Sequence, residues 1–284
     1  MKFGVFHLVW GTPPLSDEAI PQLAARARGA GAEMLAIAVS ADPPPFSPRA
    51  ARVALAAEGL EPSLVTSLGA ERDIGSADRA VRAAGLEFMR HYVEYAAELG
   101  SRTLAGPLFG PVWQPTLLSA DEHASRWSAC VESLSELAPF AAQAGVRLAV
   151  EPLSRFHTSF LNTATDCRRL VDAVGHPAIG IVLDTFQMNI EEKDLGAAIR
   201  AAGPRLFQLH ACENDRGTPG SGHIDWPMVR DALRDVGFDD DIIIEAFNPE
   251  ITGLANFMKA WRRLEVDQDT LARDGLTFLK SLLR

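Results

Sequence analysis

Short runs of apolar residues alternate along the chain with longer segments in which apolar residues recur every three or four positions. The short runs are rich in β-branched residues and are flanked by glycine or proline, which is typical of buried parallel strands. The longer segments have the spacing of amphipathic helices. We therefore predict eight strands, at residues 2–8, 34–39, 62–66, 102–106, 147–151, 180–184, 206–210 and 241–245.

Capping residues and glycines mark the ends of the helices between these strands. Ser16 and Asp17 can cap a first helix that runs toward Gly31, and Pro48 can begin a second that ends near Gly59. Further helices are predicted at residues 77–99, 121–145, from 165, at 226–236 and at 271–283.

Eight strand–helix alternations follow one another without a linker rich in glycine, serine or charge. This order predicts one (β/α)8 barrel, a TIM barrel, as a single domain over residues 1–284. The alternative fold is a doubly wound open sheet.

The last four predicted strands each end in an ionisable residue: Glu151, Asp184, His210 and Glu245. In a parallel barrel the carboxyl ends of all strands lie on the face that carries catalytic residues, so these side chains can converge. Two carboxylates ~4 Å apart repel by about 4 kcal/mol at an effective dielectric constant of about 20, so three of them need protons or a cation. Oxygen donors with one imidazole suit Mn²⁺, Mg²⁺ or Co²⁺, and zinc stays open. The alternative is four separate charges at the barrel rim, each solvated or paired with an arginine.

Composition narrows the classes of function. The 284 residues are 47% hydrophobic, enough for one large core, and the net charge of −10 without a basic stripe argues against binding to nucleic acid. The odd number of cysteines, three, favours the cytoplasm over a disulfide-bonded secreted protein. No run approaches the ~18 apolar residues of a membrane span. The apolar start breaks at Gly11 without a cleavage site, so we interpret it as the first strand and not as a signal peptide.

The motifs around the strand ends resemble the xylose-isomerase-like TIM-barrel superfamily of sugar isomerases and epimerases. Within it they are most similar to the ketose 3-epimerases that act on psicose, tagatose or ribulose. The motifs that carry the resemblance are EPLSRF at 151–156, FLNTATD at 160–166, LDTFQMNIEE at 183–192, HACENDRGTPGSGHIDW at 210–226 and IIIEAF at 242–247.

This resemblance implies one divalent metal ion, usually manganese, magnesium or cobalt, bound by Glu151, Asp184, His210 and Glu245. It also implies that Glu151 and Glu245 are an acid/base pair on opposite faces of the sugar. One glutamate removes the proton from carbon 3 of a ketose, a cis-enediolate forms, and the other glutamate returns a proton from the far side. Positioned groups of this kind contribute on the order of 10²–10⁴-fold in rate.

Five residues are candidate substrate contacts. The resemblance assigns substrate oxygens to Arg216, for which a salt bridge with an acidic neighbour in its own loop is the alternative. Gln187 and His157 stand where the family has histidine and glutamate near carbons 1 and 2 of the substrate. Trp113 follows the fourth strand, where the family has an aromatic side chain over the pocket, and His7 lies at the end of the first strand. The two replacements keep the reaction class and leave the identity of the sugar open.

Several other functions are alternatives to a ketose 3-epimerase. The same metal site and glutamates suit an aldose–ketose or hydroxypyruvate-type isomerase. The superfamily's DNA-repair endonucleases use three zinc ions and extra histidines, and here the second and third strands end without histidine in an acidic chain. A sugar-binding protein without catalytic activity is expected to lose Glu151 or Glu245, and this chain retains both. Members of the family are commonly homodimers or homotetramers, and residues 77–99 or the segment around Trp261 are candidate contacts.

Overall fold

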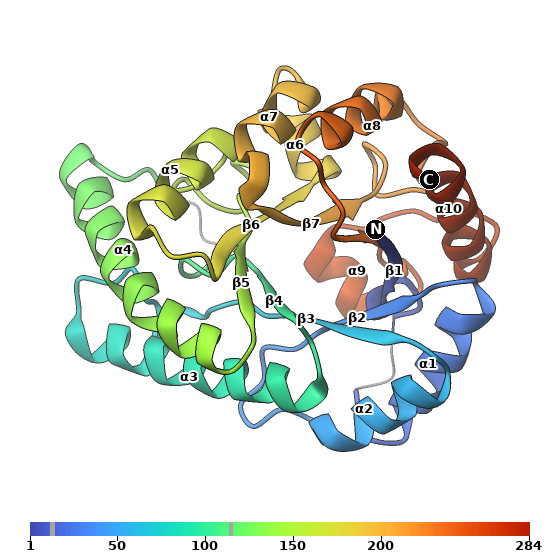
Figure 1. Cartoon of the computed structure of the whole chain (residues 1–284), viewed down its shortest axis with the longest axis horizontal. Helices are drawn as coiled ribbons and strands as arrows, with labels where there is room; N and C mark the ends of the chain where they lie inside the picture. Colours follow the sequence, from blue (N-terminus) through green and yellow to red (C-terminus); the bar gives the residue numbers. More distant parts are fainter. Residues whose placement is uncertain (12–14, 114–115) are drawn as a thin grey trace.

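Within the part of the chain that the structure describes, eight parallel strands close into a barrel surrounded by helices (Figure 1). The computed structural model describes residues 1–11, 15–113 and 116–284. Each strand pairs with the next along the chain, and the last strand pairs with the first, which closes the sheet. The predicted (β/α)8 barrel is confirmed, and the open-sheet alternative is wrong. The strands are β1 (Lys2–Phe6), β2 (Met34–Ala38), β3 (Glu61–Val65), β4 (Thr103–Gly106), β5 (Arg147–Val150), β6 (Ile179–Asp184), β7 (Leu206–Ala211) and β8 (Asp241–Ile244).

The helices pack their apolar faces against the outside of the barrel. Their bounds are α1 (Ala19–Gly29), α2 (Pro48–Ala57), α3 (Arg79–Leu99), α4 (Ala120–Gln143), α5 (Ala164–Val174), α6 (Thr185–Glu191), α7 (Leu195–Ala202), α8 (Trp226–Asp235), α9 (Thr252–Met258) and α10 (Gln268–Leu283). Short 3₁₀ turns lie at η1 (His7–Val9), η2 (Ala70–Arg72) and η3 (Gly203–Arg205).

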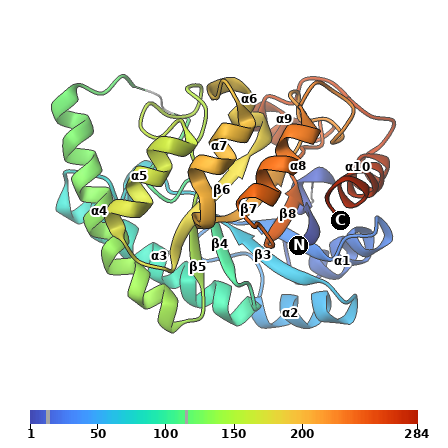
Figure 2. The same cartoon turned by 45° about the horizontal axis from the view of Figure 1, so that its top comes forward.

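Two features of the helical layer differ from the sequence prediction. The segment between β6 and β7 holds two short helices, α6 and α7, because Asp184 and Asp194 each cap a separate helix start. Helix α9, which was not predicted, follows β8. Figure 2 shows α6 and α9 at the same end of the barrel, the end where β6 and β8 finish.

Close packing of neighbouring strands at this end depends on a glycine. Gly106 ends β4 with φ of +126°, a backbone conformation that residues with side chains rarely adopt. A Cβ atom at this position would lie 2.2 Å from the carbonyl oxygen of Thr66. Glycine therefore allows the ends of β3 and β4 to approach each other beside the site described below.

Among the described residues, no helix combines the length and the apolar character that crossing a membrane requires.

Candidate metal centre

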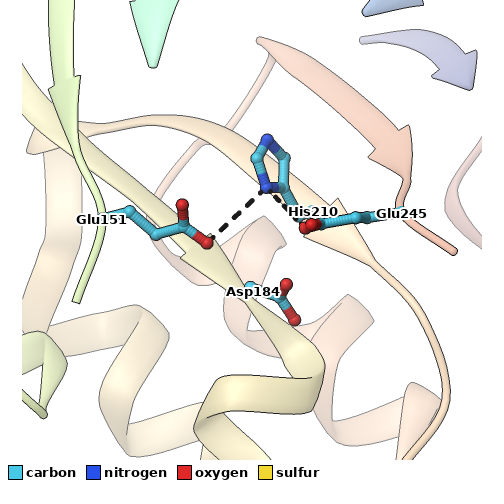
Figure 3. A group of neighbouring side chains, drawn as sticks. All are labelled: Glu151, Asp184, His210 and Glu245. Atoms are coloured by element: carbon cyan, nitrogen blue, oxygen red, sulfur yellow. Dashed lines mark ion pairs between the residues drawn. The ribbon is translucent and has the colours of Figure 1, made fainter. Parts of the chain in front are cut away.

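Four ionisable side chains meet at the carboxyl ends of β5 to β8 (Figure 3). Asp184 is the last residue of β6, His210 is the penultimate residue of β7, and Glu151 and Glu245 directly follow β5 and β8. One donor atom of each residue lies within 4.8 Å of the donor atoms of the other three, and all four residues are buried. The convergence expected from the strand ends is therefore present, and the alternative of four separate rim charges is wrong.

Two atoms of this cluster lack hydrogen-bond partners among the described residues. The Nδ1 atom of His210 lies 3.1 Å from Oε2 of Glu245 and 3.8 Å from Oε1 of Glu151, as the dashed lines in Figure 3 mark. Both His210 Nδ1 and Glu245 Oε2 are buried without a hydrogen bond. Leaving a buried polar atom unsatisfied costs about 1–3 kcal/mol. A divalent cation bound by three carboxylates and one imidazole fits these orphaned atoms and this donor chemistry.

An uncharged residue inside the barrel orients His210. The Nε2 atom of His210 lies 3.0 Å from the amide oxygen of Gln208, and the amide nitrogen of Gln208 donates to Ser63 Oγ at 3.0 Å. Because the amide nitrogen is used by Ser63, the amide oxygen accepts the Nε2 proton of the imidazole. All three residues are buried. Nδ1 is thereby left facing the carboxylates, in the orientation that a metal ligand needs.

Arg216 supplies positive charge to the cluster. Its Nη1 atom lies 2.5 Å from Oδ2 of Asp184 and 3.3 Å from Oε2 of Glu245. The guanidinium carbon lies 4.3 Å from the ring centroid of Phe186 and 5.2 Å from that of Phe247, within the range of cation–π contact. The alternative of a salt bridge with an acidic neighbour in the same loop is wrong, because the partners of Arg216 are Asp184 and Glu245 of the candidate metal centre.

A further buried carboxylate, that of Glu213, holds the loop that carries Arg216. Oε1 of Glu213 accepts hydrogen bonds from Trp226 Nε1 at 2.6 Å and from the backbone N–H of Gly220 at 2.7 Å. A Cβ atom on Gly222 would lie 2.5 Å from Oε2 of Glu213, so the chain wraps closely around this side chain. The glycine-rich segment at 217–222 therefore forms a turn around an internal carboxylate.

The electrostatic environment shifts the pKa values of the two glutamates of the cluster in opposite directions. Burial raises the pKa of Glu151 above its ordinary value. Burial also acts to raise the pKa of Glu245, but Arg216 and His210 outweigh it and hold this pKa below its ordinary range. Burial raises the pKa of Asp184 to about 7. The cluster thus contains one glutamate that keeps its proton more readily and one that loses it more readily.

Three of the candidate substrate contacts lie together beside the cluster. Ser154 joins two of them: its hydroxyl lies 3.0 Å from His157 Nδ1, and its backbone N–H donates to the amide oxygen of Gln187 at 2.9 Å. The ring of Trp113 stands perpendicular to that of His157, with centroids 4.0 Å apart. Burial lowers the pKa of His157 to about 4, so the imidazole is neutral near pH 7. This wall of the pocket therefore presents uncharged polar groups.

His7 has a different environment. Its Nδ1 atom accepts the backbone N–H of Ala38 at 3.2 Å, at the end of β2. Burial lowers the pKa of His7 to about 4, which keeps the ring neutral. His7 is absent from the described residues that line the pocket around the cluster. In the structure His7 therefore contacts the barrel wall, and its contact with substrate stays a prediction.

Comparison with known proteins identifies the family to which the chain belongs. A family model described as the xylose isomerase-like TIM barrel matches residues 2–282. The chain belongs to this family. The L-ribulose 3-epimerase of Mesorhizobium japonicum is 34% identical over 98% of this chain and 93% of the relative. The D-psicose 3-epimerase of Agrobacterium fabrum is 34% identical over 79% of this chain and 77% of the relative. A solved structure of D-psicose 3-epimerase with D-tagatose from Clostridium cellulolyticum H10 matches with a TM-score of 0.91 at 27% identity, covering 100% of both chains.

Membership of the xylose isomerase-like family confirms the resemblance read from the motifs. Sequence reasoning missed the residues that support the cluster without carrying charge. Gln208 lies two positions before His210, and it is the one polar position within the otherwise apolar start of β7, which was a usable signal. Ser40, Thr66 and Ser67 line the pocket where β2 and β3 finish, and hydroxyl residues at strand ends are too common to have singled them out.

Proposed function

We propose that this protein is a divalent-metal-dependent ketose 3-epimerase. The observation that carries the proposal is the buried group of Glu151, Asp184, His210 and Glu245, with unsatisfied polar atoms that face one another. The sequence identity of 34% to an L-ribulose 3-epimerase over nearly the whole chain supports the same activity class.

The four residues of the group would hold the ion through three carboxylates and Nδ1 of His210. When bound, a divalent ion polarises a carbonyl group and stabilises negative charge that develops on oxygen. We propose manganese as the native ion, with magnesium or cobalt as substitutes, because oxygen donors dominate the set and thiolates are absent from it.

Glu151 and Glu245 are proposed as the acid/base pair. Both line the pocket around the cluster, and they follow β5 and β8, so the two strands between them separate their backbones. This placement allows them to address opposite faces of a bound sugar. One of the two glutamates takes the proton from carbon 3, and the other returns one to the opposite face of the enediolate. In the reverse reaction the two roles exchange.

The remaining pocket residues are proposed to position the sugar. Arg216 directs its guanidinium at the cluster and can donate further N–H groups to substrate oxygens. Gln187 and His157 offer neutral hydrogen-bonding groups, and Trp113 covers them from the loop after β4.

The assembly and the location of the protein are also proposals. The described chain leaves Trp261 68% exposed, which suits a contact in a homodimer or homotetramer. Cys130, Cys167 and Cys212 are free and buried, as is usual for a protein of the reducing cytoplasm.

The test is incubation of the manganese-loaded protein with a panel of ketoses in deuterated water, followed by NMR. We expect deuterium at carbon 3 together with inversion of that centre. Glu151→Gln and Glu245→Gln should abolish the exchange, whereas Glu94→Gln, which changes an exposed glutamate on α3, should leave it intact. Deuterium at carbon 1 or 2 with a moved carbonyl group would support the isomerase alternative instead. A panel without any exchange would overturn the proposal.

A further inference from the structure

Two connected chambers of the pocket above the candidate metal centre differ in size and depth. The inner chamber has a volume of 150 Å³ and reaches Glu151 and Glu245. The outer chamber has a volume of 820 Å³ and is therefore several times larger. The chambers are continuous because six residues line both: Trp113, His157, Arg216, Phe247, Phe257 and Met258. A ketose with carbon 3 between the two glutamates fills the inner chamber and leaves most of the outer chamber without contacts to the ligand.

The walls of the two chambers differ in chemistry. The inner chamber presents the hydroxyl groups of Ser40, Thr66 and Ser67, which match the hydroxyl groups of a sugar. The outer chamber is lined largely by aromatic and aliphatic side chains, including Trp113, Phe156, Phe186, Ile190, Phe247 and Phe257. Mostly apolar walls with a few polar groups are typical of ligand sites.

Two of these aromatic side chains are unusually accessible. Phe156 is 67% exposed and Phe257 is 56% exposed, and both belong to the outer chamber. Exposed aromatic side chains that border a pocket mark a binding surface, since their burial by a ligand is favourable. They lie on different segments, Phe156 after β5 and Phe257 on α9, so a ligand between them contacts both sides of the chamber.

Positive charge is sparse in the wall of the outer chamber. Among its described wall residues, the positive side chains are Arg216 and Lys259. The charge of Arg216 is offset by Asp184 and Glu245, whereas Lys259 donates one Nζ–H to the carbonyl oxygen of Asn256 at 2.9 Å and has no carboxylate partner among the described residues. Phosphate groups are bound by free arginine or lysine donors or by helix N-termini. With Lys259 as the one cation of the described wall that lacks a carboxylate partner, and with largely apolar neighbours, the outer chamber suits an uncharged group better than a phosphate.

We propose that the substrate is an unphosphorylated ketose that carries a second uncharged group, such as a glycosyl residue, and that this group lies between Phe156 and Phe257 in the outer chamber. The inference rests on the proposed function for its ketose end, which places carbon 3 at Glu151 and Glu245. The new element is the second uncharged group, which extends the substrate beyond one sugar ring.

The experiment compares equilibrium binding of four sugars to the manganese-loaded protein by titration calorimetry. The sugars are fructose, fructose 6-phosphate, and two disaccharides in which a glucosyl group is attached to O1 or O6 of fructose. We expect at least one disaccharide to bind ~10-fold more tightly than fructose, a difference that a well-filled apolar subsite supplies.

Two variants and one control locate the gain in affinity. Phe156→Ala should raise the Kd of the preferred disaccharide by about 10-fold and leave that of fructose unchanged, because Phe156 lines the outer chamber and not the inner one. Phe257 borders both chambers, so Phe257→Ala should lower the preference for the disaccharide over fructose by about 10-fold, whatever its effect on fructose itself. Val53→Ala removes a side chain that is 70% exposed on α2, outside the pocket, and should change neither value. Melting temperatures of all three variants establish that the fold is retained.

The outcomes separate this inference from the proposed function. Equal or weaker binding of both disaccharides, tighter binding of the phosphate, or disaccharide binding that is insensitive to both phenylalanine variants overturns the extended substrate. Deuterium exchange at carbon 3 is measured on the same sugars. Preferred binding of a disaccharide without exchange supports the extension and removes the 3-epimerase. Exchange into fructose without any preference for the disaccharides supports the 3-epimerase and overturns the extended substrate. Absence of binding by all four sugars overturns both the 3-epimerase and the extended substrate.

Discussion

Replacement of Gln208 by leucine tests whether the barrel interior prepares His210 for a metal ion. In the structure Gln208 accepts the Nε2 proton of His210 and donates to Ser63 on the opposite side of the barrel. Leucine has a similar size and neither hydrogen-bonding group. The change therefore removes the acceptor that fixes Nδ1 toward the carboxylates, and it leaves the four candidate ligands in place.

The size of the effect follows from burial. Gln208 is 0% exposed and His210 is 1% exposed, so water does not replace the lost acceptor. A buried N–H group without a partner costs about 1–3 kcal/mol. Since about 1.4 kcal/mol is tenfold in affinity, and partners of ligating histidines contribute about 10–100-fold in metal binding, we expect Gln208→Leu to weaken binding of Mn²⁺ by about 10–100-fold.

The assay is titration calorimetry of Mn²⁺ into the metal-free protein, without any substrate. Gln208→Glu is the matched control, because its carboxylate still accepts the Nε2 proton and should keep most of the affinity. The melting temperature of each metal-free variant reports any loss of fold. Binding of Mn²⁺ to Gln208→Leu with wild-type affinity would refute the role assigned to this residue.

Two further predictions concern charge and pH. Arg216→Met leaves Asp184 and Glu245 without their counter-charge, so the metal-free protein should lose about 3–5 kcal/mol of unfolding free energy in urea, and an unchanged value would contradict the pairing. Burial lowers the pKa of His7 from 6.5 to about 4, so below pH 6.5 the unfolded chain binds a proton that the folded chain does not. Stability should therefore fall as the pH drops from 6.5 to 4, by about 2 kcal/mol from this group at about pH 5, and His7→Gln should remove that part of the slope.

The features that sequence predicted are local ones. An apolar run ended by Glu151, Asp184, His210 or Glu245 is visible within a few residues, and the order of strands and helices then fixes where those ends lie. Because a closed parallel barrel gathers all carboxyl ends on one face, the topology alone predicted the cluster. No knowledge of side-chain packing was needed.

The features that sequence did not predict depend on contacts between distant segments. Gln208 acts through Ser63, which lies 145 positions earlier in the chain, and neither residue carries charge. Arg216 adopts φ of +71° in a loop built around Glu213, and only the folded loop brings it to Asp184 rather than to its acidic neighbours. Helix α9 has an N-cap position occupied by Ile251, which makes no side-chain capping hydrogen bond, so the signal for its start is weak.

Anomalous diffraction from crystals grown with Mn²⁺ locates any manganese ion that binds at the candidate metal centre. We expect one manganese ion at the carboxyl ends of β5 to β8, with oxygen atoms of Glu151, Asp184 and Glu245 and the Nδ1 atom of His210 at about 2.0–2.3 Å. An ion bound elsewhere, ligation through Nε2 of His210, or a cluster that binds no ion at saturating Mn²⁺ would contradict it.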